Sequence, residues 1–155
     1  MKKIFFLLLL LSNVSFSQAS NSLEKFKQEV NQLKGDVVLI DFWASWCIPC
    51  KDSFPWLNEL QTTYQHEGFT VLSVNLDARK QNATEFLQQY PASFPVLYDP
   101  KGKVAKAFKL KGMPSSILLN RDGSVVSRHI GFNEQKKEQY QQEIIQLLLN
   151  NPNDN

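Results

Sequence analysis

The chain has 155 residues, of which 43% are hydrophobic, and its formal net charge at pH 7 is +2. This length fits one domain with a single buried core. The excess positive charge comes from Lys2 and Lys3, since the remaining 15 basic residues equal the 15 acidic ones. A neutral domain gives no support for a nucleic-acid or membrane-surface partner.

The first nineteen residues have the pattern of an export signal. Lys2 and Lys3 form a positive start, residues 4–11 are apolar, and small residues up to Ala19 offer cleavage sites. The apolar run is too short to span a bilayer, which needs about 20 residues. We therefore expect a cleaved signal peptide at 1–19 and one exported, periplasmic domain at 20–155, with an uncleaved N-terminal membrane anchor as the alternative.

Apolar spacing and turn residues predict the elements of the domain. Helices are expected at 23–33, 47–66, 84–90 and 104–108, and strands at 37–42, 69–76, 94–98, 115–120 and 124–130. Ser22 is expected to cap the first helix, and Asn133 a last helix that carries Tyr140 and Ile144. This order predicts an α/β fold in which a mixed sheet has helices on both faces, a three-layer α/β/α arrangement.

Three segments have informative composition. Residues 37–42 are apolar almost without interruption, which is typical of a strand buried on both faces. Arg121-Asp122-Gly123 indicates a hairpin turn. Residues 101–111 contain five lysines and no acidic residue. We interpret this basic segment as a solvated face, although it could also contact an acidic partner.

The chain has two cysteines, Cys47 and Cys50, and they close almost no loop. Such a pair restricts the unfolded chain little, which favours a redox role over a structural one. Cys47 is expected at a helix N-terminus, where unpaired N–H groups and the helix dipole stabilise a thiolate. We predict that Cys47 attacks a substrate disulfide and that the more buried Cys50 releases the product.

Release requires Cys50 to lose a proton, and Asp41 is the candidate acceptor. It lies on an otherwise apolar strand, where burial should raise its pKa. The alternative is an aspartate at a strand edge in contact with water. Trp46 is predicted to line the docking surface and Trp43 to belong to the core.

Two motifs carry a family resemblance. Residues 41–50, Asp-Phe-Trp-Ala-Ser-Trp-Cys-Ile-Pro-Cys, look like the active-site strand and motif of thioredoxins. Residues 112–119, Gly-Met-Pro-Ser-Ser-Ile-Leu-Leu, resemble the cis-proline loop and following strand of that fold. Together with the export signal, Pro55 and the long segment before Met113, they resemble the exported TlpA/ResA branch, which includes the reductases of cytochrome c maturation. The resemblance spans roughly residues 23–149.

The resemblance implies a thioredoxin fold with Cys47, Cys50 and Asp41 as catalytic residues. A cis bond before Pro114 would expose the backbone of Met113 to an extended substrate strand. The predicted substrate-binding residues are Trp46, Ile48, Pro49, Met113 and Pro114.

The chain departs from the family pattern at two positions. TlpA/ResA proteins often have a glutamate three residues after the second cysteine, where this chain has Ser53. Thioredoxins pair the buried aspartate with a lysine from the neighbouring strand, at the position of Ser73 here. Asp41 is thus expected to act without either usual companion.

We expect an exported thiol–disulfide oxidoreductase that reduces disulfides in exported proteins such as apocytochrome c. The resemblance implies recycling by a membrane-bound electron donor. We also expect a monomer and no cofactor beyond the redox-active Cys47–Cys50 pair. A thiol oxidase or disulfide isomerase with the same site is the first alternative.

A non-enzymatic module is the second alternative, either redox-inactive or metal-binding. A zinc site would need further ligands beside the cysteines, and only His66 and His129 are available. Neither lies in a ligand-spaced cluster, so no metal site is predicted and both histidines are expected at the surface. Copper delivery and peroxidase chemistry are disfavoured because those relatives place their cysteines differently.

Overall fold

The computed structural model describes residues 21–150, so the predicted signal peptide and the last five residues lie outside the described part. In chain order the elements are α1 (Ser22–Gln32), β1 (Val37–Trp43), α2 (Ile48–Tyr64), the 3₁₀ turn η1 (Gln65–Glu67), β2 (Phe69–Asn75), α3 (Lys80–Gln89), β3 (Val96–Tyr98), α4 (Lys103–Ala107), β4 (Ser115–Leu119), β5 (Val125–Ile130) and α5 (Glu134–Leu149). No helix between residues 21 and 150 is both long enough and apolar enough to cross a membrane.

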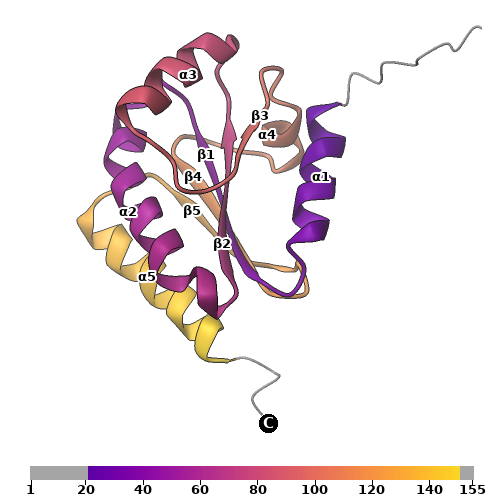
Figure 1. The fold of residues 1–155 in the computed structure, drawn as a ribbon, viewed down its shortest axis with the longest axis vertical. Coiled ribbons are helices and arrows are strands. Elements are labelled where there is room, and N and C mark those ends of the chain that lie inside the picture. The colour runs from indigo at the N-terminus through magenta and orange to yellow at the C-terminus, as the bar shows by residue number, and fades with distance from the viewer. Residues whose placement is uncertain (1–20, 151–155) are drawn as a thin grey trace, which may run out of the picture.

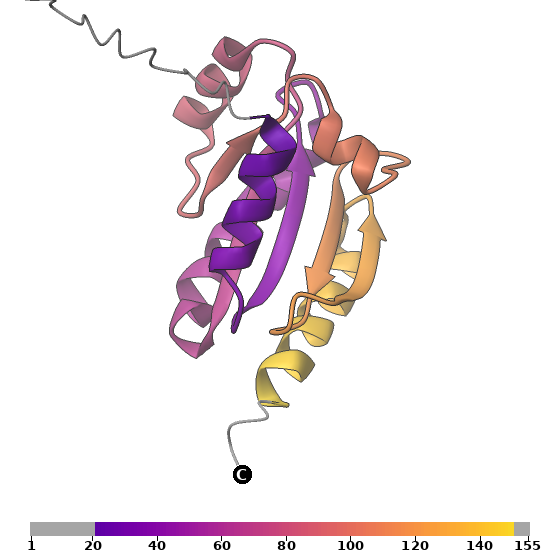
Figure 2. The same cartoon turned by 90° about the vertical axis from the view of Figure 1, so that its right-hand side faces the viewer.

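The five strands form one mixed sheet with the order β3-β2-β1-β4-β5 (Figure 1). β1 pairs in parallel with β2, and β2 with β3, while β4 runs antiparallel to both β1 and β5. Helices cover both faces: Figure 1 shows α2 and α5 on one side of the sheet and α1 and α4 on the other, and Figure 2 looks onto the side that α1 covers. The predicted three-layer α/β/α fold is confirmed.

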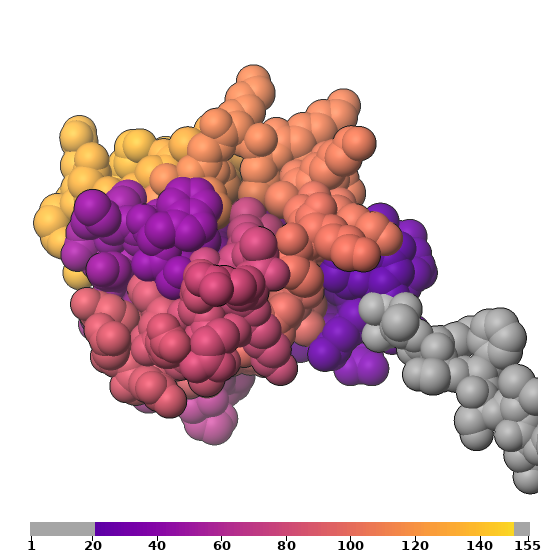
Figure 3. Space-filling view, turned by 90° about the horizontal axis from the view of Figure 1, so that it is seen from above, coloured from indigo at the N-terminus to yellow at the C-terminus, as the bar shows by residue number. Residues whose placement is uncertain are grey.

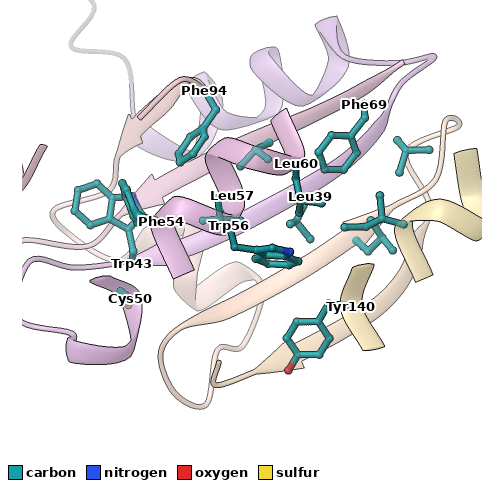
Figure 4. Packing of buried hydrophobic residues seen from close by; sticks show 14 of the residues in the cluster. Leu39, Trp43, Cys50, Phe54, Trp56, Leu57, Leu60, Phe69, Phe94 and Tyr140 are labelled. Carbon is teal, nitrogen blue, oxygen red and sulfur yellow. The ribbon is translucent and has the colours of Figure 1, made fainter. Parts of the chain in front are cut away.

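β1 lies at the centre of the sheet, and all seven of its residues are buried. On one face Leu39 and Trp43 pack with α2 and α5, and on the other Ile40 and Phe42 pack with α1 and α4. Trp43 contacts the ring of Phe54 on α2 at a centroid distance of 4.9 Å. Figure 4 shows Cys50 at the same end of this cluster as Trp43. The prediction that Trp43 belongs to the core is confirmed, and this packing fixes α2 against the strand that precedes it.

Several predicted boundaries were wrong. α3 begins at Lys80 rather than at residue 84. The prediction missed its first turn because the residues there are polar and show no apolar spacing. The cap of α1 is Asn21, whose side chain accepts a hydrogen bond from the N–H of Leu23. The hydroxyl of Ser22 instead donates a hydrogen bond to Oδ1 of Asp99, at 2.7 Å. β3 is also shorter than predicted and begins only after Pro95, which has no N–H for a sheet ladder.

The predicted hairpin is confirmed between β4 and β5. Gly123 in its turn has a φ of +85°, a conformation that glycine adopts without steric cost. Asn133 caps α5 as predicted, since its side chain accepts from the N–H of Lys136 at 2.9 Å. The hairpin and α5 complete the edge of the sheet on the side away from α3.

Candidate active site

The two cysteines follow the carboxyl end of the central strand. Cys47 is the N-cap of α2, and Cys50 lies in the first turn. They form a disulfide with each other. Cys50 is fully buried, whereas Cys47 lines a surface groove. The structure thus confirms both the helix N-terminal position of Cys47 and the deeper burial of Cys50.

The start of α2 favours a negative charge on Cys47. The first turn holds no acidic residue, and no side chain caps it. Its free N–H groups and the helix dipole therefore stabilise a thiolate. Pro49, also in the first turn, contributes no N–H to this set. Ser53 does not reach out of the helix, because its hydroxyl donates to the carbonyl of Cys50 at 3.0 Å.

A residue that the sequence analysis did not single out holds the loop before Cys47. The buried carboxylate of Asp77, after β2, accepts hydrogen bonds from the N–H and the hydroxyl of Ser45, at 2.9 and 2.7 Å. It also accepts from the side-chain amide of Asn75, at 2.7 Å. These charge-assisted bonds tie the turn after β1 to the end of β2. Asp77 thereby positions the residues that lead into Cys47.

Asp41 is buried in the middle of β1, with 1% of its surface exposed. The alternative of a water-exposed strand edge is therefore wrong. Its Oδ1 accepts a hydrogen bond from the hydroxyl of Ser116 at 2.9 Å, and its Oδ2 has no partner among the described residues. Burial raises the pKa of Asp41 to about 7, and the bond from Ser116 opposes this rise only in part.

At the two positions where related proteins have a glutamate and a lysine near the buried carboxylate, this chain has Ser53 and Ser73, and neither serine hydrogen-bonds to Asp41. Ser73 lies beside Asp41 in the sheet, but its hydroxyl accepts from the indole N–H of Trp43 at 3.3 Å. Ser116, from the strand on the other side, is the residue that contacts the carboxylate. Ser116 was not singled out in the sequence because only the sheet register brings it to Asp41.

A groove of about 650 Å³ opens beside Cys47. It is lined by Trp46, Cys47, Ile48, Pro49, Leu76, Leu110, Gly112 and Met113. Trp46 and Ile48 are 68% and 71% exposed, which is unusual for large apolar side chains. Figure 3 looks onto this end of the molecule, where the segment after β3 lies beside the start of α2. Four of the five predicted substrate-binding residues thus line one groove.

The fifth, Pro114, is buried beneath this surface. The Met113–Pro114 bond is cis, as the resemblance implied. The carbonyl of Pro114 accepts from the N–H of Gly131 at 2.8 Å. Within residues 21–150, by contrast, neither the N–H nor the carbonyl of Met113 makes a hydrogen bond to the backbone. The backbone groups left free to pair with a substrate are therefore those of Met113, and the buried Pro114 is held by its hydrogen bond with Gly131.

The comparisons with known proteins agree with this geometry. The Redoxin family model matches residues 13–144. The chain belongs to the Redoxin family.

Relatives place it more closely within that family. The thiol-disulfide oxidoreductase ResA of Bacillus cereus (strain ZK / E33L) is 37% identical over 117 residues, which cover 76% of this chain and 66% of that relative. The chain thus spans slightly less than two thirds of this relative's length. The predicted membership of the TlpA/ResA-type thiol-disulfide oxidoreductases is confirmed.

Solved structures give the same placement. A protein assigned as thiol:disulfide interchange protein DsbE from Chlorobium tepidum is 47% identical, with a TM-score of 0.76 over 77% of this chain and 84% of that one. StoA from Bacillus subtilis is 31% identical, with a TM-score of 0.59 over 68% of this chain and 82% of that one. This chain therefore shares its fold with both of these structures.

One prediction about this Redoxin chain was wrong. His66 is exposed, but His129 is buried on β5. Its ring stacks on Tyr140 at a centroid distance of 3.7 Å, and its Nε2 lies 2.8 Å from a carboxylate oxygen of Glu143. A lone histidine on a polar strand gave no sign that α5 would cover it. In the described part of the chain, no three His, Cys, Asp or Glu side chains gather as a metal site would require.

Hydrogen bonds hold the pKa of Glu143 below its ordinary value. Burial alone would raise this pKa, but bonds from Ser127, His129 and Gln139 outweigh it. The carboxylate therefore stays ionised beside the His129 ring and links α5 to β5. We assign His129 and Glu143 to the packing of this edge.

Proposed function

We propose that this Redoxin chain reduces disulfides in exported proteins. The observation that carries the proposal is the different placement of the two sulfurs. Cys47 lines a groove that Met113, whose backbone groups are free of backbone hydrogen bonds among the described residues, also lines, while Cys50 is fully buried. One sulfur is placed to meet a polypeptide, and the other is placed to meet only its partner sulfur.

In the first step, the Cys47 thiolate of the reduced chain attacks a substrate disulfide. An extended substrate strand pairs with the N–H and carbonyl of Met113, as in β-augmentation. Trp46 and Ile48 provide apolar contact at the rim. Attack forms a bond between Cys47 and one substrate sulfur, and the other substrate sulfur leaves as a thiolate that takes up a proton.

In the second step, Cys50 gives its proton to Asp41 and attacks Cys47. This forms the Cys47–Cys50 disulfide and releases the second substrate sulfur as a thiolate, which takes up a proton from Asp41 to become a thiol. A carboxyl group whose pKa is about 7 suits this exchange, because it can accept a proton at neutral pH and lose it again. The substrate gains two electrons and two protons, and the chain loses them.

The direction of the reaction and its setting are part of the same proposal. The relatives named thiol-disulfide oxidoreductase ResA and thiol:disulfide interchange protein DsbE support thiol–disulfide exchange. The direction of reduction, with apocytochrome c as a candidate substrate, follows from the resemblance to the TlpA/ResA branch. The export pattern at the N-terminus supports a reaction outside the cytoplasm, in the periplasm. A membrane-bound electron donor would restore the dithiol, and the chain would act as a monomer without a further cofactor.

The reduction potential tests the direction. Equilibration of the purified chain with glutathione buffers, read out by the fraction of Cys47–Cys50 disulfide, should give a value near that of thioredoxin, about −270 mV. A chain at that potential donates electrons to exposed or strained disulfides, whose potentials are higher, and not to structural disulfides with potentials below about −300 mV. A value near about −120 mV would contradict the proposal and assign the chain to the oxidases instead.

A further inference from the structure

A second groove lies next to the one at Cys47. It has a volume of about 460 Å³ and lies between residues 107–111, the last residue of α4 and the four that follow, and the strands β4 and β5. Its apolar walls are Phe108, Leu110, Ile117 and Ile130. Apart from Leu110, which also lines the first groove, and Ser116, which contacts Asp41, the proposed reaction uses none of its residues, although Ile130 is 48% exposed.

The two grooves adjoin at one shared wall residue. Leu110 lines both of them, and Lys111 of the second groove directly precedes Gly112 and Met113 of the first. An extended chain advances about 3.3 Å per residue, so a few residues suffice to pass from one groove to the next. A polypeptide that pairs with Met113 therefore meets the second groove as it continues.

The second groove is positively charged. Lys109, Lys111 and Arg128 line it, and all three are exposed. No acidic residue lines either groove, and within residues 21–150 none of the three cations forms an ion pair. The guanidinium of Arg128 lies over the Phe108 ring at 5.7 Å and donates to the Phe108 carbonyl at 3.2 Å, so its charge is held at the wall.

This charge is local, because the domain after the export signal has equal numbers of acidic and basic residues. Positive groups without partners beside apolar walls complement a segment with both carboxylates and apolar side chains. The lysine-rich segment, interpreted from sequence as a solvated face, thus contributes two of its lysines to a groove wall.

We propose that the substrate of this chain continues from Cys47 past Leu110 into the second groove, and that this flanking segment is acidic and apolar. Its carboxylates lie against Lys109, Lys111 and Arg128, and its apolar side chains lie against Phe108 and Ile130. The proposal rests on the proposed function and names a substrate class for it: exported proteins whose target disulfide is flanked by acidic residues.

Synthetic peptides with one disulfide test the proposal. Three peptides share the disulfide and an apolar flanking residue and differ only in carrying two Glu, two Gln or two Lys beside it. The parent should reduce the Glu peptide about tenfold faster, in kcat/KM, than the Gln peptide, and the Lys peptide most slowly. The preference should weaken as salt is raised from 20 to 500 mM, values chosen to bring the Debye length from roughly 20 Å to about 4 Å.

Two double variants supply the matched comparison. K109E/K111E should reverse the order of the Glu and Lys peptides. K101E/K103E makes the same change in net charge on the same segment but outside this groove, and it should keep the order of the parent. Reduction of a small, uncharged disulfide reports whether Cys47 and Cys50 still work in each variant, and it should stay unchanged.

Equal rates for the three peptides in the parent, with the small disulfide still reduced, would overturn the acidic substrate class and leave the proposed function intact. A preference that K101E/K103E reverses as strongly as K109E/K111E would overturn the assignment to this groove. If the parent reduced neither the peptides nor the small disulfide, the proposed function itself would fail, and this proposal with it.

Discussion

Serine in place of Cys47 is expected to lower the rate of disulfide reduction by at least about 100-fold, because a hydroxyl at neutral pH is not the nucleophile that a thiolate is. Cys47, 4% exposed, lines the groove, whereas Cys50 is fully buried and lines no part of it, so we expect that Cys50 does not take over the attack. Single-turnover reduction of a disulfide peptide by the pre-reduced variant measures the loss.

Cys50→Ser is the matched control for this variant. It retains the attacking sulfur but lacks the one that releases the product, so a covalent complex of chain and peptide should accumulate. Mass spectrometry of the intact complex detects it. If Cys47→Ser retained the rate of the parent, the assignment of the two sulfurs would be wrong.

Asp41→Asn is expected to stabilise the oxidised fold above neutral pH. The folded chain keeps a proton on Asp41 up to a pH of about 7, whereas the unfolded chain loses it near 3.8. Stability therefore falls as the pH rises through this window. The raised pKa corresponds to a destabilisation on the order of 4 kcal/mol at pH 8, which the amide removes.

Urea unfolding of the oxidised proteins at pH 4, 6 and 8 measures this effect. The advantage of Asp41→Asn over the parent should be smallest at pH 4 and largest at pH 8. Asp52→Asn, which removes an exposed carboxylate from α2, should show no such trend. A constant difference between Asp41→Asn and the parent at all three pH values would contradict a raised pKa for Asp41.

The same variant should be slower in the reaction although it is more stable. Without the carboxylate, Cys50 has no buried proton acceptor, so release of the mixed disulfide should slow by about 10- to 100-fold at pH 7, the range of general-base catalysis. The inflection near pH 7 in the rate of release should disappear as well. An unchanged pH profile would show that another group accepts the proton.

The parts of the site that the sequence predicted are those that local sequence determines. The spacing of Cys47 and Cys50, the β-branched run of β1 and the Asp-Gly turn each depend on residues within a few positions of one another. For the same reason the start of the active-site helix could be placed to within one residue. A local pattern of this kind needs no knowledge of the sheet register.

The parts that were missed arise between distant segments. Asp77 meets Ser45 across 32 positions, and Ser116 meets Asp41 across 75. His129 is buried only because α5 folds back over β5. The basic groove forms where the segment after α4 approaches the β4–β5 hairpin. Polar residues at such sites show no period, so their partners follow from the tertiary fold and not from the chain.

The order in which the two thiols of the reduced chain react with iodoacetamide tests most directly whether Cys47 is the attacking sulfur. Short exposure at pH 7, followed by peptide mass spectrometry, identifies the modified residue. Cys47 should be modified first, and Cys50 should remain unmodified until the chain is unfolded in urea. Modification of Cys50 at the same rate as Cys47, or before it, would contradict the roles assigned to the two sulfurs.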